Sequence, residues 1–204
     1  MATDHVRIRI TGTHALIMHN NQGVNIRLPR VQEMKAINKK RNKTEEDFDA
    51  LARIEWELGL YYDAKLGPCL PSTVILAALR EGAKKTKQGK LLLESVLMDE
   101  SMVKMEYEGP RKVDALYADG RFVDMRPVRV QTSRVNRARP IFPLGWSAEF
   151  TLTYEAELID EGDLVNIVKT TGRRIGLCDY RPTYGRFDVQ VIGNGAGSRK
   201  GAAE

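Results

Sequence analysis

The sequence predicts an α+β protein with a ferredoxin-like (RRM-like) βαββαβ core that carries insertions. Residues 5–11 and 145–154 alternate apolar and polar side chains, which is typical of strands with one buried face. Residues 72–86 and 160–175 repeat apolar side chains at helical spacing, and 186–192 alternate again. Strands and helices in this order form an antiparallel sheet with both helices on one face.

The first predicted insertion spans about residues 12–70. Within it, 30–41 are predicted to form either a basic helix or a mobile segment. Thr44 precedes three acidic residues, which predicts a capped helix start that Gly59 ends. The apolar stripe of that helix is Phe48, Leu51, Ile54 or Glu55, and Leu58. A small hairpin is expected around residues 65–67.

The second half of the chain begins with a helix that Ser72 is expected to cap. Residues 87–125 are interpreted as a second insertion that holds two short strands, 95–98 and 102–107. Residues 126–131 and 134–139 are predicted to be extended, with a bend between them. The helix after Asp160 places Arg173 and Arg174 in its last turn, where cations are favourable.

The 204 residues therefore predict one domain over 1–192 and a low-complexity, disordered tail over 193–204. No segment has the apolar length of a membrane helix, and the first residues do not resemble a secretory signal. Cys69 and Cys178 are interpreted as reduced, buried thiols rather than as a disulfide framework. Together these features predict a cytoplasmic protein.

The net charge of +5 is modest, but the basic residues are clustered. Six arginines lie in 121–139 beside a single acid, Asp124, and further basic blocks occupy 27–43 and 169–200. Separated basic blocks favour a polyanionic partner, and the alternative is that they form solvated surfaces.

Two segments supply the candidate binding residues. In the glycine-rich segment 172–186, arginines are expected to contact phosphates and tyrosines to stack on bases. The alternative there is a rigid turn with packed tyrosines and with arginines paired to Asp179 and Asp188. The extended segment 126–139 is expected to line a groove for a single strand, or else to contact acids of a neighbouring subunit. The candidates are Arg126, Arg129, Arg134, Arg137, Arg139, Arg173, Arg174, Tyr180, Arg181, Tyr184 and Arg186.

Three segments resemble a known family: THALIMHN after the first strand, PSTVILAALR from Pro71, and GRRIGLCDYRPTYG from Gly172. They are similar to the RAMP superfamily, in particular to the CRISPR backbone subunits that polymerise along guide RNA. The chain is shorter than such subunits and its last loop differs. It therefore resembles a small stand-alone relative on a phage or other mobile element, acting in a bacterial or phage-infected host cell.

The combined prediction is a non-enzymatic protein that binds single-stranded RNA or DNA and oligomerises along it as a helical filament. No cofactor and no metal site are expected, because no HxxxH or CxxC spacing is present. Related RAMP endoribonucleases use a histidine, so cleavage through His14 or His19 is one alternative. A structural assembly protein, for instance of a virion, is another.

Overall fold

The computed structural model describes residues 3–130 and 133–195 as a mixed α+β fold with antiparallel sheets, which confirms the predicted class at that level. The larger sheet has the strand order β10–β1–β9–β6–β4–β3, and β5 pairs with the same edge of β9 as β6 does. Its strands are β1 (Thr3–Gly12), β3 (Tyr62–Asp63), β4 (Gly67–Pro71), β5 (Val96–Met98), β6 (Met102–Glu106), β9 (Ser147–Glu155) and β10 (Phe187–Gly195).

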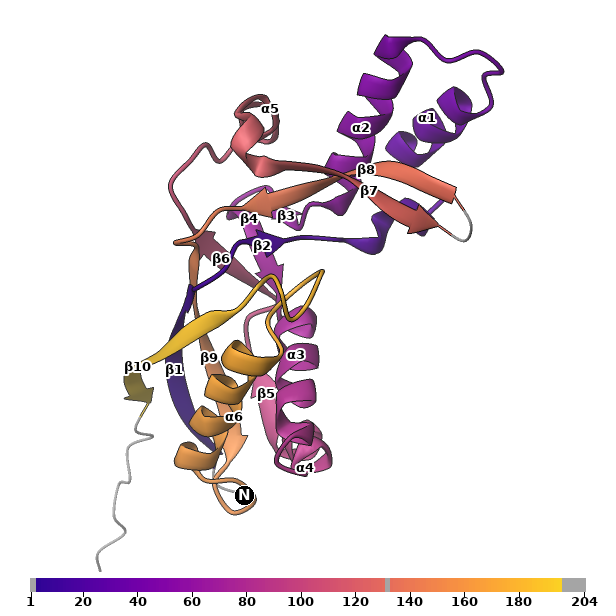
Figure 1. The fold of residues 1–204 in the computed structure, drawn as a ribbon. Coiled ribbons are helices and arrows are strands. Elements are labelled where there is room, and N and C mark those ends of the chain that lie inside the picture. Colours follow the sequence, from indigo (N-terminus) through magenta and orange to yellow (C-terminus); the bar gives the residue numbers. More distant parts are fainter. Residues whose placement is uncertain (1–2, 131–132, 196–204) are drawn as a thin grey trace, which may run out of the picture.

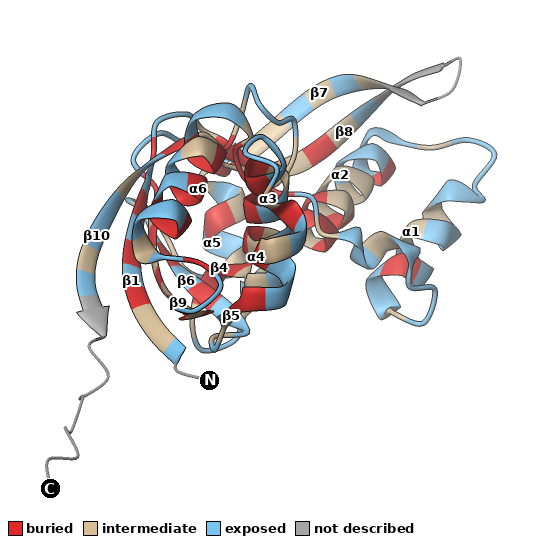
Figure 2. Cartoon of the chain, turned by 90° about the horizontal axis from the view of Figure 1, so that it is seen from below, coloured by how far each residue is buried: buried red, intermediate tan, exposed pale blue. Residues whose placement is uncertain are grey.

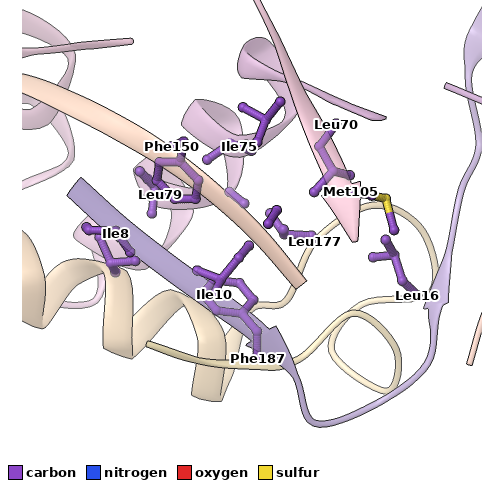
Figure 3. Close-up of a cluster of buried hydrophobic side chains, with 14 of the residues drawn as sticks. Ile8, Ile10, Leu16, Leu70, Ile75, Leu79, Met105, Phe150, Leu177 and Phe187 are labelled. Atoms are coloured by element: carbon purple, nitrogen blue, oxygen red, sulfur yellow. The ribbon is translucent and has the colours of Figure 1, made fainter. Parts of the chain in front are cut away.

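The strands at the centre of this sheet have the alternation that the sequence predicts. Val6, Ile8 and Ile10 of β1 are buried, and every second residue of β9 is buried against the same side. Two helices, α3 (Ser72–Lys84) and α6 (Glu161–Arg174), lie side by side on that face (Figure 1). The buried residues concentrate between the strands and these helices (Figure 2), and side chains from β1, β4, β9 and α3 converge there (Figure 3).

The two covering helices touch where α3 has no side chain. A Cβ atom on Gly82 would lie 2.0 Å from the Oγ1 atom of Thr171 on α6. Thr171 is fully buried, and its hydroxyl donates a hydrogen bond of 2.8 Å to the carbonyl of Ile167. The close approach of the two helices therefore requires glycine at position 82.

The second strand of the core comes from a part of the chain that we predicted to be an insertion. β5 and β6 follow α3 and precede α6 in the chain, and both pair with β9. Residues 96–106 therefore supply the second strand of the core. Two short helices in the same region, α4 (Gly89–Ser95) and α5 (Val113–Ala118), escaped the sequence pattern because each spans two turns or fewer. A single 3-10 turn, η2 (Gly120–Phe122), precedes the next strand.

The first insertion contains a 3-10 turn, η1 (Asn21–Val24), and two helices, α1 (Pro29–Asn38) and α2 (Glu45–Gly59). The helix option for 30–41 is thus the correct one. The predicted cap of α2 is confirmed, because Thr44 accepts a hydrogen bond from the Asp47 N–H and the Asp47 carboxylate accepts one from the Thr44 N–H. The predicted cap of α3 is wrong, since Ser72 is the first helical residue and the position before it is Pro71.

The stripe of α2 is buried at one end only. Ile54 and Leu58 pack with Val31 of α1 in a small second core, as predicted for that stripe. Phe48, at the start of the same stripe, is 59% exposed. The helix extends past the residues that cover it, which leaves this aromatic ring at the surface.

A second, three-stranded sheet has the order β2–β8–β7 and consists of β2 (Leu16–Ile17), β7 (Val123–Val130) and β8 (Ser133–Phe142). β7 and β8 form a hairpin that lies beside α2 (Figure 1).

At the other end of the chain, β10 reaches Gly195, so the strand continues beyond the predicted end at residue 192. Residues 196–204 of the predicted tail lie outside the described residues. Within residues 3–130 and 133–195, none of the helices combines the length and the apolar composition that spanning a bilayer requires.

Candidate nucleic-acid interface

The arginine-rich segment 126–139 forms the two arms of the β7–β8 hairpin. Cross-strand neighbours in it are Asp124 and Arg139, Arg126 and Arg137, and Arg129 and Arg134. The side chains of Arg129 and Arg134 lie outside the described part of the structure. At the base of the hairpin, Leu16 and Ile17 of β2 pair with residues 142 and 141 of β8, which connects the hairpin to the segment after β1.

The C-terminal loop, 176–186, is joined to the hairpin through the same short strand. The N–H of Asp179 donates to the carbonyl of Ile17 in β2 at 2.9 Å, and the N–H of Gly185 donates to that of Ala15 at 2.8 Å. The loop also closes on itself, with the N–H of Leu177 donating to the carbonyl of Gly185 at 2.9 Å. A side chain at position 185 would collide with the backbone of Leu177, because its Cβ atom would lie 2.1 Å from the carbonyl oxygen of Leu177.

Where hairpin and loop meet, two arginines and two tyrosines form a cluster that we call the Arg–Tyr cluster: Arg126, Arg139, Tyr180 and Tyr184. The guanidinium carbon of Arg126 lies 5.1 Å from the ring centroid of Tyr180 and 5.0 Å from that of Tyr184. The guanidinium of Arg139 lies 4.8 Å from the Tyr180 ring. The two rings meet edge to face at 6.2 Å. These distances are those of favourable cation–π and aromatic pairs.

Two carboxylates partly neutralise the Arg–Tyr cluster. Asp124 forms an ion pair with Arg126, and Asp179 lies 3.3 Å from Nη1 of Arg139. The hydrogen bond from Arg126 to Asp124 raises the pKa of the guanidinium, which is therefore charged at neutral pH. In the part of the chain that the structure describes, Nη1 of Arg139 and Oδ2 of Asp124 are buried without a hydrogen-bond partner. Among the described residues, Nη1 of Arg139 is therefore held in place by its ion pair with Asp179 alone.

The remaining candidate arginines do not join this cluster. Arg137 forms an ion pair with Glu55 of α2, while Arg173 and Arg174 are exposed at the end of α6. Arg181 is exposed on the loop, and Nε of Arg186 donates to the carbonyl of Pro182 at 2.7 Å. The structure thus brings together four of the predicted residues, and the other candidates whose side chains it describes lie outside this cluster.

Sequence reasoning missed the elements that hold the Arg–Tyr cluster in place. Residues 16 and 17 form only a two-residue strand, which no periodicity can reveal, yet they connect hairpin and loop. The carboxylate of Glu55 accepts a hydrogen bond from the N–H of Ala138 along the free edge of β8. The pairing of Asp179 with an arginine was anticipated only as the alternative to binding. The sequence did contain one indication that Asp124 pairs with an arginine, since it is the single acid among six arginines in 121–139.

The exposed face of the large sheet offers a different surface. Its β1 residues include Arg7 and Arg9, and both form ion pairs with Glu149 of β9. The other β9 residues on this face are serine, threonine and glutamate. β1 and β9 therefore present no phenylalanine, tyrosine or tryptophan ring there, and the imidazole of His5 on this face is hydrogen-bonded to Thr153 at 2.8 Å.

The histidines of the alternative hypothesis occupy the segment around β2. The side chains of His14 and His19 are exposed, and their carbonyls accept hydrogen bonds from Trp146 at 2.9 Å and from Tyr61 at 3.1 Å. His19 lines a cavity of about 290 Å³ together with Arg137 and Arg139. Cys69 is buried, which raises its pKa to about 11, and Cys178 is half-buried; both are free thiols.

Comparison with solved structures shows a similar fold in an RNA-bound assembly. A chain in the cryo-EM structure of Type III-B Cmr-β bound to cognate target RNA superposes with a TM-score of 0.53 and 12% sequence identity. The match covers 94% of this protein and 60% of that chain, so the protein spans well under the full length of the chain it resembles. This likeness concerns the fold alone. No family model matches the sequence, and no curated protein matches it.

Proposed function

We propose that this protein is a RAMP-like, non-enzymatic binder of single-stranded nucleic acid. The observation that supports this most directly is the Arg–Tyr cluster, in which two arginines and two tyrosines from distant segments meet at the base of an arginine-rich hairpin. Phosphates are bound by cationic donors and bases by aromatic faces, and this combination tolerates any sequence.

The order of the core supports the family assignment within this proposal. The large sheet places β10, β1, β9 and the pair β5/β6 in the order of a βαββαβ unit, with α3 and α6 on one face. The resemblance noted at 71–80 falls on the end of β4 and the start of α3, and that at 172–185 on the end of α6 and the C-terminal loop. A similar fold occurs in a chain of an RNA-bound Cmr complex, which favours RNA over DNA as the first ligand to test.

The proposal includes assembly of several copies along one strand. The hairpin extends from the core beside α2 (Figure 1), so it can reach a neighbouring copy on the same strand. Weak individual sites joined along a filament would then bind cooperatively. Sedimentation of the protein on long and short strands tests this part separately, since cooperative assembly requires the long strand.

One specific observation favours cleavage as a second candidate function. His19 lines one cavity with Arg137 and Arg139, so an exposed imidazole shares this space with two arginines, each paired with a carboxylate. Incubation of the protein with labelled single-stranded RNA and DNA, without added metal, separates the candidates. A retarded but intact strand supports binding without catalysis, and a shortened strand supports the endoribonuclease. A strand that is neither retarded nor shortened supports the structural assembly protein.

A salt titration of the same binding reaction tests the role of the arginines. The logarithm of the affinity should fall with the logarithm of the salt concentration by about 0.7 for each phosphate neutralised. The variant Arg126→Gln should lower this slope, while Arg7→Gln, on the far face of the sheet and paired with Glu149, is the matched control. An affinity that does not depend on salt contradicts the proposed phosphate contacts.

A further inference from the structure

A groove of about 780 Å³ separates the first part of α2 from the hairpin. One wall consists of Arg41 and Lys43, which precede α2, and of Phe48 and Leu51 within it. The other wall consists of β7 and β8 residues, among them Met125 and Asn136. Figure 1 shows that the last turns of α2 lie against the hairpin and that its first turns extend away from it.

The walls of this groove expose large apolar side chains. Phe48 is 59% exposed and Met125 is 52% exposed, although both line a concave surface. The small core between α1 and α2 uses Ile54 and Leu58 and does not reach Phe48. An exposed aromatic ring and a thioether that line the same groove are typical of a site for a flat apolar ligand.

The charged groups at the groove favour an anionic ligand. Among the residues that the structure describes, neither Arg41 nor Lys43 forms an ion pair with a carboxylate, and Lys43 donates only to the backbone carbonyls of residues 38 and 40. Two acids also line the groove. The carboxylate of Glu55 is engaged by Arg137 and by a backbone N–H, whereas Asp49 remains open to a donor.

We propose that the groove binds one nucleotide of a single-stranded nucleic acid, with the base between Phe48 and Met125 and a neighbouring phosphate at Arg41 and Lys43. The amide of Asn136, which is exposed, and the carboxylate of Asp49 offer polar partners for the edge of the base. The volume accommodates a nucleotide, and base–aromatic stacking has no sequence requirement.

This site rests on the proposed function and adds a second contact region to it. Met125 alternates with Asp124 and Arg126 along β7, so it lies on the face of the hairpin away from the Arg–Tyr cluster. A bound strand would therefore contact the hairpin on both faces.

Photo-crosslinking with single-stranded RNA that carries 5-iodouridine, together with fluorescence anisotropy, tests the groove. Phe48→Ala should weaken binding by about 5- to 150-fold, the loss expected for one stacked base. Phe48→Tyr keeps a stacking face and should bind like the unmodified protein. Leu93→Ala, which shortens an exposed apolar side chain on the distant helix α4, is the control and should change neither affinity nor crosslink.

The outcomes distinguish this site from the proposed function as a whole. A crosslink at Phe48 with reduced affinity of the alanine variant and an unchanged Tm supports the groove. Full affinity of Phe48→Ala, with crosslinks elsewhere, overturns the groove and leaves the proposed function intact. An alanine variant with altered self-association but unchanged RNA affinity also overturns it, because the groove is then a protein contact. Absence of any RNA binding by the unmodified protein overturns both proposals.

Discussion

Nη2 of Arg126 donates a hydrogen bond of 3.0 Å to the phenol oxygen of Tyr184, and the same guanidinium lies 5.0 Å from the centroid of that ring. The two residues are 58 positions apart in the sequence and belong to the hairpin and to the C-terminal loop. Tyr184 is half-buried, whereas its neighbour Tyr180 is exposed. The two tyrosines therefore differ in what they can offer to a ligand and to the fold.

For Tyr180, we predict an effect on binding. Its side chain is exposed and its ring lies near the guanidinium groups of Arg126 and Arg139, so Tyr180→Ala should weaken binding of single-stranded RNA by about 1–3 kcal/mol. The Tm should change little, because an exposed ring contributes little to packing. Anisotropy titrations and thermal melts measure the two quantities, and an early melt with normal binding would assign Tyr180 to the fold.

For Tyr184, we predict a contribution to stability in addition to any base stacking. Tyr184→Phe removes only the hydrogen bond to Arg126 and should lower the free energy of unfolding by about 1 kcal/mol. Tyr184→Ala also removes the half-buried ring and should lower it further. Chemical denaturation of both variants gives these values. Binding that is lost in Tyr184→Ala at full stability would instead place the ring among the base-stacking residues.

The central strands and α6 could be predicted because their side chains repeat strictly. Ile8, Ile10 and Phe150 fall on one face of the sheet as their spacing requires, and Asp160 caps α6 as an acid at that position should. β5 and β6 were predicted as short strands at 95–98 and 102–107, but strands of three and five residues give no sign in the sequence that they belong to the core sheet. The second core strand was therefore assigned to an insertion.

The candidate site was predictable in residue types and unpredictable in geometry. Clustered arginines beside tyrosines indicated Arg126, Arg139, Tyr180 and Tyr184, but nothing in the sequence indicated that the hairpin and the loop meet. Their meeting depends on two residues of β2 and on long-range backbone hydrogen bonds such as that from Asp179 to Ile17. The sequence also did not indicate that Phe48 is exposed, because an apolar stripe on a helix does not show which of its residues other parts of the protein cover.

For Arg181, we predict a phosphate contact that is independent of sequence. The side chain is exposed, and its charge helps to lower the pKa of Glu81 on α3, although Lys84 is the main cause of that shift. Arg181→Ala should weaken binding equally for all strand sequences and reduce the salt slope by about one phosphate contact. Titrations of homopolymeric strands at several salt concentrations check this, and a loss confined to one sequence would contradict it.

For His14 and His19, we predict that substitution leaves binding intact. Both use their backbone carbonyls in the fold and expose their rings, so His14→Ala and His19→Ala should bind within a few-fold of the unmodified protein. Labelled RNA incubated with each variant shows whether any cleavage depends on these rings. Cleavage by the unmodified protein that disappears in His19→Ala, with binding retained, would favour the endoribonuclease.

The last prediction tests the contact between α3 and α6. Alanine is a better helix former than glycine by about 1 kcal/mol, so helix propensity alone predicts that Gly82→Ala stabilises the protein. The new Cβ would, however, lie 2.0 Å from Oγ1 of the fully buried Thr171, whose rotation would break its hydrogen bond to Ile167. We therefore expect a net loss of about 1–3 kcal/mol and a Tm lower by roughly 2–4 °C per kcal/mol.

A second substitution identifies the cause of this loss. Thr171→Ala removes the oxygen that the new Cβ meets, so the double variant Gly82→Ala/Thr171→Ala should be more stable than the two single losses added together. Thermal melts of the four proteins give this coupling. A higher Tm for Gly82→Ala, or strict additivity in the double variant, would mean that the helices are not in contact at this point. The packing of α3 and α6 on one face of the sheet would then need another explanation.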